Sequence, residues 1–285
     1  MFTLNCNGKL LLIDRPLVMG IINATPDSFY PGSRFFGRDK ILEHAEKMVA
    51  EKADIIDIGG QSTRPGSRPV SQNEELHRVI EGIECIHKKF SEIIISVDTF
   101  YSAVAKEAVH AGASMVNDIS GGTIDEQMIT TVAELKVPYV AMHLKGTPET
   151  MQQQAHYENV TREVIDFFIG KKDECNKAGI RDLVIDPGFG FAKNAQHNFE
   201  LLRNLATFKI VNCPVLVGLS RKSTIYKTLG ISTEEALNGT TVLNTIALMN
   251  GANILRVHDV REAKEAVALC SLINPVVASN DVAVD

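Results

Sequence analysis

The chain has 285 residues, of which 45% are hydrophobic and 22% are charged, and its formal net charge is −6. This composition excludes a largely disordered chain and is typical of a globular protein with a large core. The negative charge argues against a general nucleic-acid or anionic-membrane surface, but it leaves room for a local basic pocket that binds an anion.

The five cysteines are scattered, and none belongs to a Cys-x-x-Cys pair. We therefore expect reduced, mostly buried thiols rather than metal ligands or disulfides. No apolar run reaches about 18 residues, and the N-terminus lacks the basic and apolar regions of a signal peptide. These features predict a cytoplasmic protein with no membrane partner.

The first predicted element is a β-hairpin within residues 2–13, because two short apolar runs flank Asn7-Gly8. A strand buried on both faces follows at 18–22, and a polar loop from Asn23 to Phe29 ends it. Apolar residues then recur at helical spacing over 41–49. A second buried strand at 55–58 ends in a loop rich in glycine and proline at 59–66.

The remaining sequence repeats this alternation of helix and strand. The predicted strands are 93–97, 115–116, 139–142, 183–185, 214–217 and 254–255. Capping pairs predict where three of the helices between them begin, at Ser71/Glu74, Thr123/Glu126 and Ser232/Glu235, and the last of these three ends at Gly251. Three further helices run from Ser102 to Gly112, through 164–168 to near Gly179, and over a segment after Phe191. A last helix starts at Asp259.

Eight strands alternate with eight helices, and neither a linker nor a low-complexity tract divides them. This pattern predicts a single domain over 1–285, a TIM (β/α)₈ barrel with an N-terminal β-hairpin at 1–14. An open, doubly wound sheet is the alternative, because periodicity does not show whether a sheet closes.

Three carboxylates, Asp98, Asp118 and Asp186, each come directly after a buried strand. An ionised group there needs a cation or hydrogen-bond donors, so we expect them at one mouth, where a carboxylate could accept two hydrogen bonds from a 2-amino-4-oxo heterocycle. The alternative role for each of them is to cap the following helix or to bind backbone amides.

Five cationic candidates also follow strands, which suits a phosphorylated or pyrophosphorylated ligand: Arg64, Arg221, Lys222, Arg256 and His258. Neutral oxygens at Asn23, Thr25, Ser62 and Thr63 suit phosphate and a hard cation such as magnesium. Phe29 and Phe191 lie in loops with little core to join, which favours a planar ligand.

With these residues in view, the chain closely resembles the dihydropteroate synthase family from Val18 to His258. The motifs that carry the resemblance are Gly20-Ile-Ile-Asn-Ala-Thr-Pro-Asp-Ser-Phe29, Ser62-Thr-Arg-Pro-Gly66, Ser96-Val-Asp-Thr99, Asn117-Asp-Ile-Ser-Gly-Gly122, Met142-His143, Asp186-Pro-Gly-Phe-Gly-Phe191, Ser220-Arg-Lys222 and Arg256-Val-His258.

The resemblance implies a transferase that joins 6-hydroxymethyl-7,8-dihydropterin pyrophosphate to p-aminobenzoate, is inhibited by sulfonamides and forms a homodimer. The implied pterin site comprises Asp98, Asn117, Ile119, Met142, Asp186, Phe191, Gly218, Lys222 and Arg256. The implied pyrophosphate site comprises Asn23, Thr63, Arg64, Arg256 and His258, with Asn23 as the protein ligand of Mg²⁺, and the p-aminobenzoate side comprises Phe29, Thr63, Arg64, Pro65, Phe191 and Ser223. Catalytic roles would fall to Asn23, Thr63, Arg64, Asp98, Lys222, Arg256 and His258.

The sequence departs from the family pattern at three positions: Pro31 replaces a common Asp, Gln61 a common Glu, and Ala192 a frequent Gly. Two alternatives share the same pocket. One is a methyltetrahydrofolate methyltransferase, and the other is a barrel that binds pterin without turning it over. The Ser-Thr-Arg-Pro-Gly and Ser-Arg-Lys-Ser sequences favour the synthase.

Overall fold

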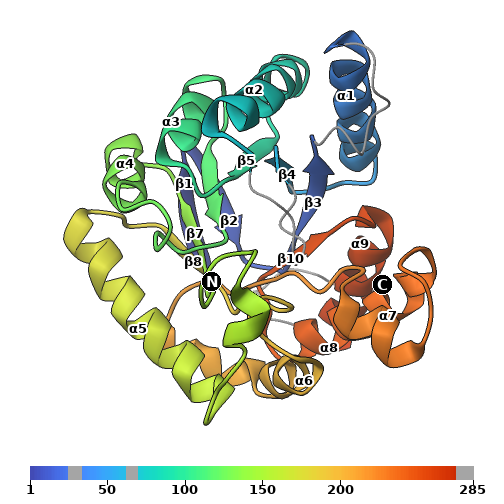
Figure 1. Ribbon diagram of the computed structural model, residues 1–285. Coiled ribbons are helices and arrows are strands. Elements are labelled where there is room, and N and C mark those ends of the chain that lie inside the picture. Colours follow the sequence, from blue (N-terminus) through green and yellow to red (C-terminus); the bar gives the residue numbers. More distant parts are fainter. Residues whose placement is uncertain (25–33, 62–69, 274–285) are drawn as a thin grey trace, which may run out of the picture.

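The computed structural model describes residues 1–24, 34–61 and 70–273. Within them, eight parallel strands form one sheet in the order β8-β7-β6-β5-β4-β3-β10-β9, and a bridge between Ile185 and Val215 joins its two edges. Helices surround this nearly closed barrel (Figure 1). The predicted barrel is confirmed, with strands β3 (Leu17–Asn23), β4 (Ile55–Gly59), β5 (Ile94–Asp98), β6 (Met115–Asp118), β7 (Tyr139–Met142), β8 (Leu183–Asp186), β9 (Leu216–Val217) and β10 (Ile254–Val257).

The outer layer contains nine α-helices among the described residues, one more than the sequence predicts. They are α1 (Arg34–Ala50), α2 (Gln72–Lys89), α3 (Ser102–His110), α4 (Met128–Leu135), α5 (Val160–Ala178), α6 (Ala195–Arg203), α7 (Ser223–Leu229), α8 (Leu237–Met249) and α9 (Val260–Ile273). The sequence analysis missed α7, a helix of 7 residues that ends at Gly230. A segment of two turns offers too few positions for a helical period to stand out.

The predicted cap of α4 at Thr123 is wrong, because this helix begins at Met128. The Thr123 hydroxyl instead donates to the carbonyl of Ser120, and the Asp125 carboxylate accepts from the amides of Ser102 and Gln127. These bonds hold the segment as a turn. The predicted cap at Ser71 is confirmed by a hydrogen bond from the amide of Glu74 to the serine hydroxyl. Ser232 and Glu235 make the expected reciprocal bonds, but these enclose the start of a short 3₁₀ helix, Glu234–Ala236, and α8 itself begins at Leu237.

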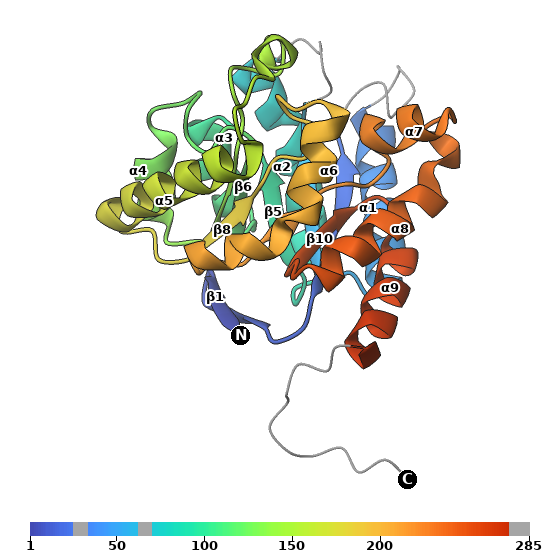
Figure 2. The same cartoon turned by 90° about the horizontal axis from the view of Figure 1, so that it is seen from below.

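The N-terminal hairpin, β1 (Phe2–Cys6) and β2 (Lys9–Ile13), covers one end of the barrel, opposite the end that carries α7 (Figure 2). Its turn residues Asn7 and Gly8 both have positive φ, as the Asn-Gly pattern predicts. Leu4, Cys6 and Ile13 pack with buried residues from every barrel strand, two from β3 and one from each of the others, namely Leu17, Met19, Ile55, Ile94, Met115, Val140, Val184, Leu216 and Ile254. This apolar layer seals the end of the barrel where the strands begin and leaves the other end for polar side chains.

Four of the five cysteines are buried and all five are free, as predicted. In the described ranges 1–24, 34–61 and 70–273, no helix is both long and apolar enough to cross a membrane.

Candidate active site

Strand register brings polar side chains to one level at the carboxyl end of the barrel. Asn23 of β3 pairs with Gly59 of β4, Gly59 pairs with Asp98 of β5, and Asp98 pairs with Asn117 of β6. Gly59 leaves room for the Asp98 side chain, because a Cβ at position 59 would lie only 3.3 Å from the Cβ of Asp98. Three of the predicted site residues therefore line adjacent strand ends.

Arg256 lies on β10, the strand next to β3, and its side chain reaches across the end of the barrel to this row. Its Nε donates to Asp57 Oδ2 at 2.6 Å, and its Nη2 donates to Asp98 Oδ2 at 2.6 Å. The Asn117 Nδ2 donates to the same Asp57 oxygen at 3.1 Å. Asp57 is completely buried, so it fixes the directions of two predicted pterin ligands from beneath.

Charge and burial compete in this cluster. Burial raises the pKa of Asp98 to about 7, and the negative charges of Asp57 and two further carboxylates add to this shift. The Arg256 guanidinium opposes it. Burial would lower the pKa of Arg256, but the carboxylates of Asp57 and Asp98 outweigh it and raise that pKa. The guanidinium thus stays charged, and its charge favours the ionised form of Asp98 against the effect of burial.

A second charged pair stands where β8 and β9 end. Burial raises the pKa of the Asp186 carboxyl and lowers the pKa of Lys222 to about 8, and each group opposes the shift of the other through its charge. The Lys222 Nζ donates to the Phe189 carbonyl at 2.5 Å and lies 4.7 Å from the centre of the Phe191 ring. A Cβ on Gly218 would lie 3.6 Å from this Nζ, so the predicted residues Asp186, Phe191, Gly218 and Lys222 do come together.

An apolar cluster forms the wall beside these charges. Ile119, Met142 and Phe191 are all buried and pack together with Phe100, Leu144, Met151 and Ala192. Met151 belongs to a short 3₁₀ helix, Met151–Gln154. Ala192 has a φ of 49°, which explains why glycine would suit this position better.

His258, Asn23 and Ser223 stand at the rim. The His258 Nδ1 lies 3.0 Å from the Ser220 hydroxyl, which also accepts from the His258 amide at 3.2 Å. Asn23 ends β3 with an exposed side chain, and Ser223 is the first residue of α7. Phe29, Thr63, Arg64 and Pro65, together with Thr25, Ser62 and Pro31, lie outside the described residues.

Asp118 does not join the mouth, so the expectation that the three carboxylates converge is wrong for this residue. One of its oxygens accepts from the amide and hydroxyl of Ser120, and the other accepts from the Gly122 amide and the Tyr139 hydroxyl, each at 2.7 Å. Four internal donors occupy the carboxylate, which holds the turn after β6. This is the local role that the sequence left open.

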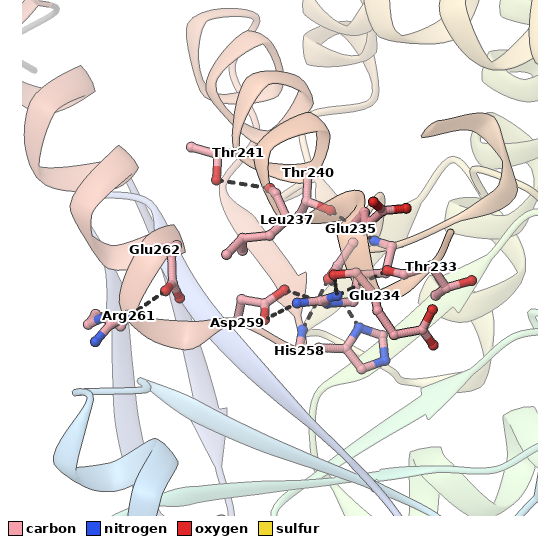
Figure 3. A network of polar contacts seen from close by, with 12 residues as sticks. Thr233, Glu234, Glu235, Leu237, Thr240, Thr241, His258, Asp259, Arg261 and Glu262 are labelled. Atoms are coloured by element: carbon pink, nitrogen blue, oxygen red, sulfur yellow. Dashed lines mark hydrogen bonds and ion pairs between the residues drawn. The ribbon is translucent and has the colours of Figure 1, made fainter. Parts of the chain in front are cut away.

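Arg221 is also absent from the predicted anion site. Its guanidinium forms two hydrogen bonds of 2.9 Å to Asp259, one from Nε and one from Nη2, and its Nη1 donates to the carbonyls of Thr233 and Glu234. Figure 3 shows Asp259, Thr233 and Glu234 in this network, with His258 beside it. Arg221 therefore ties the segment before α8 to the start of α9.

Sequence reasoning missed three buried charged residues around the site. Asp57 could have been found, because a carboxylate inside the apolar run Ile55–Ile58 needs a partner. Glu75 is buried below Gln61, whose Nε2 donates to Glu75 Oε2 at 2.5 Å. Lys193 is buried beside His143, and nothing in its surrounding sequence distinguishes it from a surface lysine.

The donor set suits a weakly held magnesium ion. Asn23 offers a neutral amide oxygen at an exposed strand end, and the described residues contain no group of three acidic, His or Cys side chains that could hold a metal ion. Mg²⁺ commonly keeps several waters and binds through one or two protein oxygens plus substrate phosphates. Asn23 fits that mode.

Comparison with known proteins places the chain clearly. A family model described as pterin binding enzyme matches residues 19–258. A dihydropteroate synthase of Haemophilus influenzae is 44% identical over 259 residues, covering 90% of this chain and 94% of the relative. The Yersinia pestis dihydropteroate synthase in complex with a sulfonamide drug superposes with a TM-score of 0.90 at 39% identity, covering 96% of this chain and 100% of that chain. The Xanthomonas albilineans enzyme in complex with 7,8-dihydropteroate gives 0.86 at 37% identity, covering 95% and 98%.

Proposed function

The chain belongs to the dihydropteroate synthase family, and from this premise we propose how its residues divide the work of the reaction. It is a transferase that condenses 6-hydroxymethyl-7,8-dihydropterin pyrophosphate with p-aminobenzoate to give 7,8-dihydropteroate and pyrophosphate. The comparisons support this activity over the methyltransferase and over the barrel that only binds pterin.

The pterin ring binds among the strand-end charges described above. Asp98, Asn117, Asp186 and Lys222 hydrogen-bond its edge, Ile119, Met142, Phe191 and Gly218 line its faces, and Arg256 stacks on it. The observation that carries this assignment is the buried pair of Arg256 and Asp98, whose side chains come from strands three places apart in the sheet and meet at 2.6 Å. A carboxylate placed so deeply suits the two parallel donors of a guanidine-like heterocycle edge.

The pyrophosphate and its magnesium bind at the rim, to Asn23, Thr63, Arg64, Arg256 and His258. When bound, Mg²⁺ neutralises charge on the leaving pyrophosphate. The Ser220 hydroxyl 3.0 Å from Nδ1 orients the His258 ring, so that its other nitrogen can face the phosphate oxygens. The p-aminobenzoate lies on the side of Phe29, Thr63, Arg64, Pro65, Phe191 and Ser223, where sulfonamides compete with it.

The reaction needs no nucleophilic side chain. We infer that the bond from carbon to pyrophosphate oxygen ionises first, leaving a pterin-delocalised cation, and that the amine of p-aminobenzoate then attacks. Carboxylates Asp98 and Asp186 stabilise the cation electrostatically, while Arg256 and His258 stabilise the departing anion. Lys222 orients the pterin and keeps Phe191 beside it through its position over the ring.

We infer also that the protein acts in the cytoplasm as a homodimer, in which helices away from the active mouth meet. The proposal is supported by large apolar side chains that α8 and α9 expose: Val242, Ile246, Met249, Leu269, Leu272 and Ile273. Sedimentation of the wild type and of a Val242→Glu/Ile246→Glu variant tests it. A monomeric wild type, or a variant that remains dimeric, would contradict this interface.

Pyrophosphate release from the pterin pyrophosphate, measured with and without p-aminobenzoate and Mg²⁺, tests the assigned activity. We expect magnesium-dependent release together with dihydropteroate formation. Tight pterin binding without product would instead support a barrel that only binds pterin.

A further inference from the structure

Lys193 is a buried lysine that the assignments above leave without a role. Only 3% of its surface is exposed, and its Nζ lies 2.9 Å from His143 Nδ1, 3.1 Å from the Phe191 carbonyl and 3.5 Å from the His143 carbonyl. Within residues 1–24, 34–61 and 70–273 it forms no ion pair within 4.0 Å. Burial lowers the pKa of Lys193 to about 7, although the charge of Asp186 opposes the shift, so the contacts that hold this side chain in the interior need a reason.

The acceptors of Lys193 belong to two different walls of the pterin pocket. Phe191 lies in the loop after β8, and His143 directly follows Met142 at the end of β7. The same two segments already meet through a hydrogen bond of 3.0 Å from the His143 amide to the Asp186 carbonyl. At Gly188 they are so close that a Cβ would lie 2.2 Å from the His143 carbonyl oxygen. Lys193 extends this contact toward the pocket.

The His143 ring is built to accept from an ammonium group. Burial, with the charges of Lys193 and Lys145, holds the pKa of His143 well below its usual range, so the ring is neutral. The edge-on contact with Phe167, at 5.0 Å between ring centres, fixes its plane. Nδ1 then offers its lone pair to Lys193, and the proton resides on Nε2.

We propose that Lys193 is a positioning residue of the pterin pocket: by joining the main chain of Phe191 to His143, it keeps the Phe191 ring beside Met142. This inference rests on the proposed function, because Phe191 and Met142 matter here as walls of the pterin site. We call these contacts of Lys193 with Phe191 and His143 the clamp. Without the clamp, the loop after β8 can move, and the bound pterin loses the wall that Phe191 provides. Phe191 also belongs to the proposed p-aminobenzoate side, but it is one of six residues there, so that substrate should be weakened less than the pterin.

The experiment compares four variants by steady-state kinetics with 6-hydroxymethyl-7,8-dihydropterin pyrophosphate and p-aminobenzoate. Lys193→Met keeps the length of the side chain without its donors, and we expect the KM for the pterin substrate to rise about tenfold, with a smaller rise in the KM for p-aminobenzoate, which Phe191 also contacts in the proposed site. His143→Asn, whose amide oxygen takes the place of Nδ1, should stay near the wild type, whereas His143→Leu should resemble Lys193→Met. Lys171→Met is the matched control, since Lys171 is also buried but pairs with Glu174 on α5.

A purely structural role would overturn the proposal. In that case Lys193→Met and Lys171→Met would both lower the melting temperature and leave the pterin KM unchanged. If Lys193→Met does not fold, the two His143 variants decide, and equal pterin KM values for them would count against the clamp. Lys222→Ala distinguishes a failure of this inference from a failure of the proposed function. If Lys222→Ala leaves the pterin KM unchanged, the proposed pterin site is wrong. If Lys222→Ala raises the pterin KM and Lys193→Met does not, only the role of Lys193 is wrong.

Discussion

Glu75 gives a prediction whose size follows from its burial. The side chain is inaccessible to solvent below the loop after β4, and a Cβ on Gly60 would lie 2.8 Å from its Cγ. Burial raises the pKa of this carboxyl from 4.5 to about 8. Gln61 Nε2 donates to its Oε2 at 2.5 Å, and a side-chain hydrogen bond with Thr99 opposes the shift of the pKa.

The sign of the effect follows from proton linkage. Below pH 4.5 both the folded and the unfolded chain hold this proton, whereas above it the unfolded chain loses the proton and the folded chain keeps it up to about pH 8. The free energy of unfolding therefore falls as pH rises, by up to about 1.4 kcal/mol per pH unit across this window. Summed from 4.5 to 8, the upper bound is about 5 kcal/mol.

Glu75→Gln removes the titration but keeps an oxygen that can accept from Gln61. We expect the variant to match the wild type near pH 5 and to be more stable by about 2 kcal/mol or more at pH 8. Urea midpoints at pH 5, 6, 7 and 8 measure the difference. Glu107→Gln on α3, an exposed position, controls for the loss of a carboxylate as such. A difference between variant and wild type that stays constant from pH 5 to 8 would refute the argument.

Three further substitutions test the assigned roles. Lys222→Ala should weaken pterin binding by about 10- to 100-fold with little loss of stability, as isothermal titration and melting curves would show; unchanged kinetics would contradict the assignment. Asp57→Asn should misdirect Arg256 and lower the free energy of unfolding by about 2–4 kcal/mol, with at least a tenfold loss of turnover; normal turnover would show that Arg256 needs only Asp98. Arg221→Met should lower stability by about 1–3 kcal/mol and leave pterin affinity within about twofold, whereas a selective loss of affinity would return Arg221 to the anion site.

The sequence predicts the barrel and most strand ends because a parallel strand buried on both faces has a continuous apolar signal that stops where the chain reaches the mouth. Asp98, Asn117, Asp186 and Arg256 all stand at such stops, so their shared location follows from topology alone. The hairpin is equally predictable, since Asn7-Gly8 supplies the two positive φ values that its turn requires.

The direction in which a side chain points after a strand is not encoded by its place in the chain. Asp118 and Asp98 look alike in sequence, yet four donors in its own turn and on Tyr139 capture Asp118. Arg221 and Lys222 are adjacent, yet a φ of 53° at Arg221 turns the two side chains to different networks. Lys193 depends on a neutral histidine 50 residues away, a pairing that only tertiary structure reveals.

The charges of the mouth are already paired among themselves before a ligand enters, and this shapes how binding proceeds. Arg256 holds Asp98 at 2.6 Å, so a pterin that hydrogen-bonds to this carboxylate must share it with the guanidinium or displace it. Asp57 is completely buried, so a pterin does not compete for its carboxylate, and its bond to Arg256 Nε is kept. Binding energy from the pterin edge is therefore exchanged in part for the ion pair between Arg256 and Asp98 rather than added to it.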